Sequence, residues 1–112
     1  MVNMKDEKYY AEKAIEDITA IKKYVGNGSY EEFLSDDRTL DAIMFRLVQL
    51  IENVKNIPVE TKGNFPNVPW GKIIGFRNGI VHEYGKTDYT TVYETIAKDL
   101  DELRLILEEI AQ

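Results

Sequence analysis

The 112-residue chain has no cysteine and only one histidine, His82. Without cysteine it cannot form disulfides, thiolate zinc sites or a cysteine nucleophile, and one histidine cannot build a multi-histidine metal site. No segment approaches the roughly 18 consecutive apolar residues of a membrane span, and residues 1–12 are too charged for a secretory signal. We therefore expect a cytoplasmic protein with no membrane segment, no metal and no cofactor.

Basic residues are also scarce: the chain has 14 lysines and arginines but 20 aspartates and glutamates, and its formal net charge is −6. Nucleic-acid-binding domains are usually basic, so the overall charge argues against a broad nucleic-acid surface. The segment 62–86 is an exception, because it carries four basic residues against one acidic residue, a net charge of +3 that leaves −9 on the rest. Charge is felt within a Debye length of about 8–10 Å, so the overall acidity does not exclude weak, site-limited binding of a nucleic acid at this segment.

Apolar residues recur at three- and four-residue spacings along most of the chain, which is the helical period. This pattern predicts long helices over 8–25, 39–57, 69–82 and 89–111 and a short helix over 30–34. Turn-forming residues make the intervening segment, 58–68, the one substantial loop. Because no segment alternates with the period of a strand, the sequence predicts an all-α, antiparallel bundle of four long helices plus one short helix, a single domain over 1–112.

Individual positions refine this prediction. Asp36 or Asp37 is expected to cap the second long helix, and Asp88 the last one. Phe45 and Val48 widen the apolar arc of the second long helix, so we expect that helix to pack against two neighbours.

The segment from Trp70 to Tyr84 departs from the pattern of an ordinary core helix. At about 100° per residue, Arg77 falls in the middle of an apolar stripe formed by Trp70, Ile73, Ile74, Ile80, Val81 and Tyr84. A buried arginine needs an anion or several acceptors. Another face of this helix carries a glycine every four residues, at Gly71, Gly75 and Gly79. Asn78 and His82 lie beside this glycine face. Three interior glycines cost about 2–3 kcal/mol relative to alanine, and such departures concentrate at functional sites.

Each of these features also has an ordinary structural explanation. Arg77 can pair with a carboxylate on another helix, and His82 can stabilise the C-terminus of its own helix. The glycines can serve helix packing, and Tyr84 can be the last aromatic residue of the core. An acidic cluster at the start of the second long helix could bind a hard cation, but helix capping explains it better: Asp36, Asp37 and Asp41.

Residues 77–84 read Arg-Asn-Gly-Ile-Val-His-Glu-Tyr, the pattern R-N-x-x-x-H-x-Y. This resembles the arginine, four-residue gap, histidine motif of the HEPN superfamily. With the tyrosine two residues later, it resembles the HepT-like toxin ribonucleases in particular. The flanking residues match the usual entry into and exit from that helix: Val68-Pro69-Trp70, Gly85 and Asp88-Tyr89. The resemblance spans nearly the whole domain.

The resemblance implies a homodimeric helical bundle in which the motifs of two subunits face each other across a cleft, where RNA is cut without metal. It also implies a partner, a minimal nucleotidyltransferase antitoxin called MntA. In that system the antitoxin adds adenylyl groups to the motif tyrosine, here Tyr84, and silences the nuclease.

The motif residues suit RNA cleavage by the ribose 2′-hydroxyl. Histidine is the side chain whose ordinary pKa lies near neutrality, so His82 is the candidate for proton transfer. Arg77 offers a forked, permanently charged donor for phosphate oxygens, and Asn78 could orient His82 or contact the ribose. A two-fold dimer would supply a second histidine, and the glycine face would let two helices or an RNA backbone approach closely.

We therefore predict a metal-independent endoribonuclease toxin with Arg77 and His82 as catalytic residues, Asn78 in support and Tyr84 as the site of adenylylation. The alternative is a non-catalytic helical subunit that binds nucleotide or RNA as the partner of a nucleotidyltransferase. A purely structural helical dimer is a third possibility, but it leaves Arg77 and the glycines unexplained.

Overall fold

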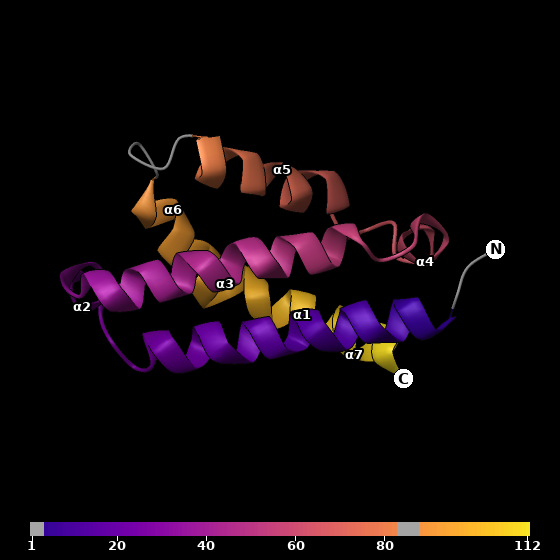
Figure 1. Ribbon diagram of the computed structural model, residues 1–112, viewed down its shortest axis with the longest axis horizontal. Helices are drawn as coiled ribbons and strands as arrows, with labels where there is room; N and C mark the ends of the chain where they lie inside the picture. Colours follow the sequence, from indigo (N-terminus) through magenta and orange to yellow (C-terminus); the bar gives the residue numbers. More distant parts are fainter. Residues whose placement is uncertain (1–3, 83–87) are drawn as a thin grey trace.

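The computed structural model describes residues 4–82 and 88–112, and every regular element in these two ranges is helical (Figure 1). The α-helices are α1 (Met4–Val25), α2 (Tyr30–Ser35), α3 (Asp37–Lys55), α4 (Val59–Gly63), α5 (Trp70–His82), α6 (Tyr89–Glu94) and α7 (Leu100–Ala111). A π-helical turn, Thr95–Asp99, joins α6 to α7. The prediction of an all-α fold is confirmed.

The centre of the bundle is α3, which lies between α1 and α5 (Figure 1). Successive long helices run in opposite directions, and α7 packs against α1 behind α3. The short helices lie at the ends, with α2 at the start of α3 and α4 after its end. No helix in the described part of the chain is both long and apolar enough to cross a membrane.

The apolar faces predicted from the sequence form one core. Apolar residues along one face of α3 are buried, as are those along one face of the last helical segment: Leu40, Ile43, Met44, Leu47, Leu50, Ile51 and Val54, then Val92, Ile96, Leu103, Leu107 and Ile110. Burying a leucine or isoleucine side chain contributes about 1.5–3 kcal/mol, so these faces hold α3 and α7 in the bundle.

Phe45 does not join this core, because its side chain is 62 % exposed, and the buried arc of α3 is therefore narrower than the apolar arc in the sequence. Val48 is partly buried against the core, and α3 contacts both α1 and α5 as expected. Phe45 stays outside because α1 and α5 occupy the two flanks of α3 and leave its outer face open.

Segment 58–68 is not a loop throughout, because residues Val59–Gly63 form α4 after Pro58 at the N-cap position. Thr61 is buried and donates its hydroxyl to the carboxylate of Glu7 on α1. Five residues are too few to show a helical period or to form a stable helix alone. The prediction of one substantial loop is therefore wrong for α4, whose stability depends on tertiary contacts.

Aspartates cap the two predicted helix starts. The Asp36 carboxylate accepts hydrogen bonds from the backbone N–H groups of Arg38 and Thr39, and Asp88 accepts one from Thr91. Hydrogen bonds from Thr39 hold the pKa of Asp36 below its ordinary value, and those from Thr91 do the same for the pKa of Asp88. Asp36, and not Asp37, is therefore the cap of α3.

The last helix was predicted to be continuous over 89–111, but it contains the π-helical turn Thr95–Asp99. The Thr95 hydroxyl donates to the carbonyl oxygen of Thr91 at 2.8 Å, and such a side-chain bond competes with the backbone ladder. In the π-turn the Leu100 N–H donates to the Thr95 carbonyl, five residues back. The apolar spacing continues through this turn, so the pattern gave no sign of it.

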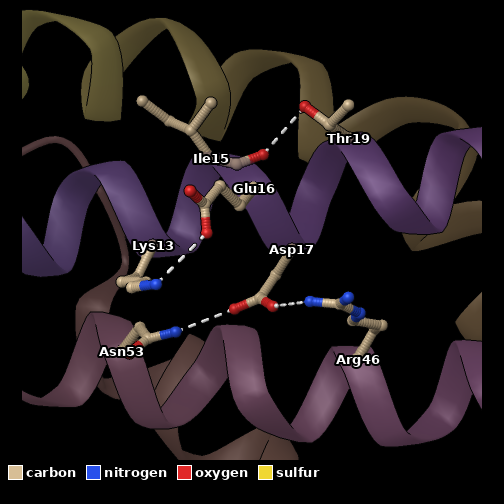
Figure 2. Close-up of polar contacts among 7 residues, drawn as sticks. All are labelled: Lys13, Ile15, Glu16, Asp17, Thr19, Arg46 and Asn53. Carbon is tan, nitrogen blue, oxygen red and sulfur yellow. Dashed lines mark hydrogen bonds and ion pairs between the residues drawn. The ribbon is translucent and has the colours of Figure 1, made fainter.

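Asp17 of α1 is a buried charge that the sequence analysis missed (Figure 2). It is 4 % exposed, and its two carboxylate oxygens accept hydrogen bonds from Arg46 Nη1 at 3.0 Å and Asn53 Nδ2 at 2.8 Å. The bond to Asp17 raises the pKa of Arg46 above its ordinary value. Burial of a carboxylate is tolerated when both oxygens have donors, so this cluster is a structural link between α1 and α3.

Candidate active site

The predicted site lies on α5, whose main contact is with α3 at the edge of the bundle (Figure 1). The Trp70 indole N–H lies 3.1 Å from the carbonyl oxygens of both Lys62 and Phe65, which fixes the start of the helix. Ile73 and Phe76 are partly buried against the core. These contacts turn one side of α5 toward α3 and leave the opposite side open.

The open side of α5 carries the three glycines. Gly71, Gly75 and Gly79 are exposed, and a Cβ atom added at any of them would meet nothing within 4 Å. Asn78 is also exposed. No described residue of the chain therefore comes close to this face, and its close approach to another molecule stays a prediction.

Arg77 lies on the side of α5 that faces α3, and its side chain is 36 % exposed. Its Nε atom lies 3.0 Å from Oε1 of Glu52 on α3, whose side chain is 37 % exposed. The Nε atom is itself buried, and it makes no hydrogen bond within the described part of the chain. The contact is therefore an ion pair in which the N–H does not point at the carboxylate oxygen.

This pair settles one question that the sequence left open, because Arg77 does have a carboxylate partner on another helix. Sequence reasoning missed Glu52, although a signal was present: it is the only acidic residue between positions 42 and 59. Glu52 also lowers the local positive charge that the segment 62–86 suggested.

His82 is the last residue of α5, five positions after Arg77. At 1.5 Å per residue this places its backbone about 7.5 Å farther along the helix axis. The side chain of His82 and the whole of Tyr84 lie outside the described residues. Their catalytic and modification roles therefore stay predictions.

Among the described residues, no group of three histidine, cysteine or acidic side chains is arranged to hold a metal ion. Two shallow hollows lie beside the turn between α1 and α2, one lined by Lys22 and Tyr93 and the other by Tyr24 and Asp36. Neither hollow includes a residue of α5. Arg77, whose side chain is 36 % exposed, therefore lines neither of these two hollows.

Comparison with protein families identifies the chain, since the family described as Ribonuclease HepT-like matches residues 14–110. The chain belongs to the HepT-like ribonuclease family. The matched range includes both Glu52 and the whole R-N-x-x-x-H-x-Y motif, residues 77–84. The family resemblance inferred from the motif is confirmed, and with it the assignment of an endoribonuclease.

Individual HepT-like relatives agree with this assignment. A candidate RNase of Caldanaerobacter subterraneus subsp. tengcongensis is 33 % identical over 109 residues, covering 97 % of each chain. A candidate RNase of Methanocaldococcus jannaschii is 29 % identical and covers 95 % of this chain and 88 % of its own. A protein of Thermococcus cleftensis named as a ribonuclease HepT is 29 % identical, covering 89 % and 91 %. No solved structure matches the chain.

Proposed function

We propose that this HepT-like chain is the toxin of a toxin–antitoxin system and a metal-independent endoribonuclease that cleaves RNA with Arg77 and His82. The observation that carries the proposal is the exposure and pairing of the Arg77 guanidinium. Its guanidinium is partly exposed and paired with one carboxylate, within the R-N-x-x-x-H-x-Y motif of a ribonuclease family. A forked cation of this kind suits the oxygens of a phosphodiester.

In this mechanism the ribose 2′-hydroxyl loses its proton to a base and attacks the adjacent phosphorus. The bond to the 5′-oxygen then breaks, and that oxygen takes a proton from an acid as it leaves. The products are a 2′,3′-cyclic phosphate and a free 5′-hydroxyl. His82 is the group that exchanges protons near neutral pH, Arg77 stabilises the charge that develops on the phosphorane oxygens, and Asn78 supports the histidine or the ribose.

A homodimer completes this proposal, because two proton transfers need two groups and each chain has one histidine. The open glycine face of α5 supports it, since helices without side chains at the contact can approach closely. The outer face of α3 is also uncovered, with Phe45 62 % exposed. We expect both surfaces to lie near the second subunit. We expect RNA to bind in the cleft between the two subunits.

We expect the chain to cut single-stranded RNA equally fast with and without EDTA, and to leave 2′,3′-cyclic phosphate ends. RNA with a 2′-deoxyribose at the cut position should stay intact, because the attacking hydroxyl is missing. Gel analysis of end-labelled RNA measures all three results, and a His82→Ala preparation controls for contaminating nucleases. RNA that is bound but never cut would instead favour the non-catalytic partner subunit of a nucleotidyltransferase.

Tyr84 follows His82 by two positions in the motif, and we propose it as the site where a MntA-like nucleotidyltransferase antitoxin adds AMP. A bulky, negatively charged group there would occupy the position of RNA phosphate. After incubation with that partner and ATP, mass spectrometry should show adenylylated Tyr84 and the nuclease should be silent. An inhibited nuclease with unmodified Tyr84 would show that the partner acts by covering the site.

A single domain over 1–112 and a cytoplasmic location stay predictions.

A further inference from the structure

Glu52 has no role in the mechanism described so far, although it is the described partner of Arg77. We propose that Glu52 is a positioning residue, which holds the Nε side of the Arg77 guanidinium so that its two terminal nitrogens face the RNA phosphate. The inference rests on the proposed function, because it assigns a task to the same arginine.

A comparison with the Asp17–Arg46 ion pair, which joins α1 to α3, separates positioning from structural support. Asp17 is 4 % exposed and both of its oxygens accept hydrogen bonds, as a structural buried carboxylate requires. Glu52 and Arg77 are each more than one-third exposed, and Arg77 Nε makes no hydrogen bond within the described chain. Exposed pairs of this kind add little to stability, so stability alone does not explain the Arg77–Glu52 pair.

The geometry of the guanidinium explains the proposed task. Glu52 contacts Nε, at the base of the guanidinium, and the terminal nitrogens Nη1 and Nη2 form the other end of the fork. These two nitrogens can bind two phosphate oxygens side by side. Glu52 is suited to hold the group because α3 is packed between α1 and α5 and is therefore a rigid support.

The charge of Glu52 gives the proposal a kinetic signature. Its carboxylate offsets the charge of Arg77, so it opposes the binding of RNA phosphate while it orients the guanidinium. Removing only this charge should therefore leave KM for RNA unchanged or lower, and should reduce kcat because the guanidinium is no longer held. A residue that supported only the fold would change neither constant in a folded variant.

The test compares Glu52→Gln with Glu60→Gln in the full-length chain. Glu60 is an exposed glutamate on α4, so its variant has the same charge change on a helix that carries neither Arg77 nor Glu52. We expect kcat to fall about tenfold or more in Glu52→Gln, since misplaced catalytic groups lose rates of this size, with no rise in KM. Glu60→Gln should match the wild type. Glu52→Asp keeps the charge and should recover part of kcat.

Two results would overturn the positioning role: a folded Glu52→Gln protein with wild-type kcat, or one in which only KM changes. Circular dichroism melting confirms that each variant is folded, and Glu52→Asp supplies the comparison if the glutamine variant is not. These failures differ from failure of the proposed function. In that case the wild-type chain itself would not cut RNA, whereas here it cuts RNA and Glu52 proves dispensable.

Discussion

Arg77→Ala and His82→Ala should each lower the rate of RNA cleavage by about 10²-fold or more. Without Arg77, the phosphorane loses the cation that stabilises its charge in the transition state. Without His82, neither the attacking hydroxyl nor the leaving oxygen has a proton-transfer group with a pKa near neutrality. Single-turnover cleavage of a labelled RNA measures the loss, and RNA affinity should fall in Arg77→Ala more than in His82→Ala.

Three comparisons make this result specific. Lys72→Ala removes an exposed positive charge from the same helix, so it should weaken RNA binding slightly and leave the cleavage step intact. Arg77→Lys keeps the charge but not the fork, and should recover only part of the activity. A folded His82→Ala protein that cuts RNA at the wild-type rate would disprove the proposed mechanism.

Gly75→Leu is expected to abolish cleavage while the chain folds as well as before or better. Nothing lies within 4 Å of the Cβ position at Gly75, so the isolated subunit accommodates a side chain. Replacing a helix-interior glycine also favours the helix by about 1 kcal/mol. If two subunits meet at this face, however, the leucine must push them apart, and a shift of about 1 Å in an active site can cost 10²-fold in rate.

The matched control for this variant is Gly63→Leu. Gly63 ends α4 and also has nothing within 4 Å of its Cβ position, but it is not on the glycine face of α5. Light scattering should show a weakened dimer for Gly75→Leu and an unchanged one for Gly63→Leu, and thermal melting should show both folded. A fully active, dimeric Gly75→Leu protein would exclude this face from the dimer contact.

The long helices were predictable because each carries its own evidence in a repeated local pattern. Apolar spacing located α1, α3, α5 and the last helical segment, and capping aspartates marked two starts. The shorter features were not predictable in the same way. The α4 helix has too few residues for a period and depends on the contact between Thr61 and Glu7. The π-turn at Thr95–Asp99 leaves the apolar spacing unchanged.

The candidate site shows the same difference between local patterns and contacts formed only in the fold. The position of Arg77 within an apolar stripe and the glycine face were readable from one segment, because both are properties of a single helix. The pairing of Arg77 with Glu52 could not be predicted from the sequence, since the two residues lie on helices that approach each other only in the fold. The same limit explains Phe45, whose exposure depends on where α1 and α5 lie against α3.

By itself, the sequence determined that the chain is all-helical and that one helix carries an arginine in its apolar stripe and three glycines on another face. It also carried the motif that identified the ribonuclease family. These properties are local, since they depend on residue types at fixed spacings along one helix. Only the tertiary structure decided that Glu52 meets Arg77, that Asp17 is buried between α1 and α3, and that the glycine face is open. Contacts between distant segments depend on how the helices pack, and no local spacing encodes that packing.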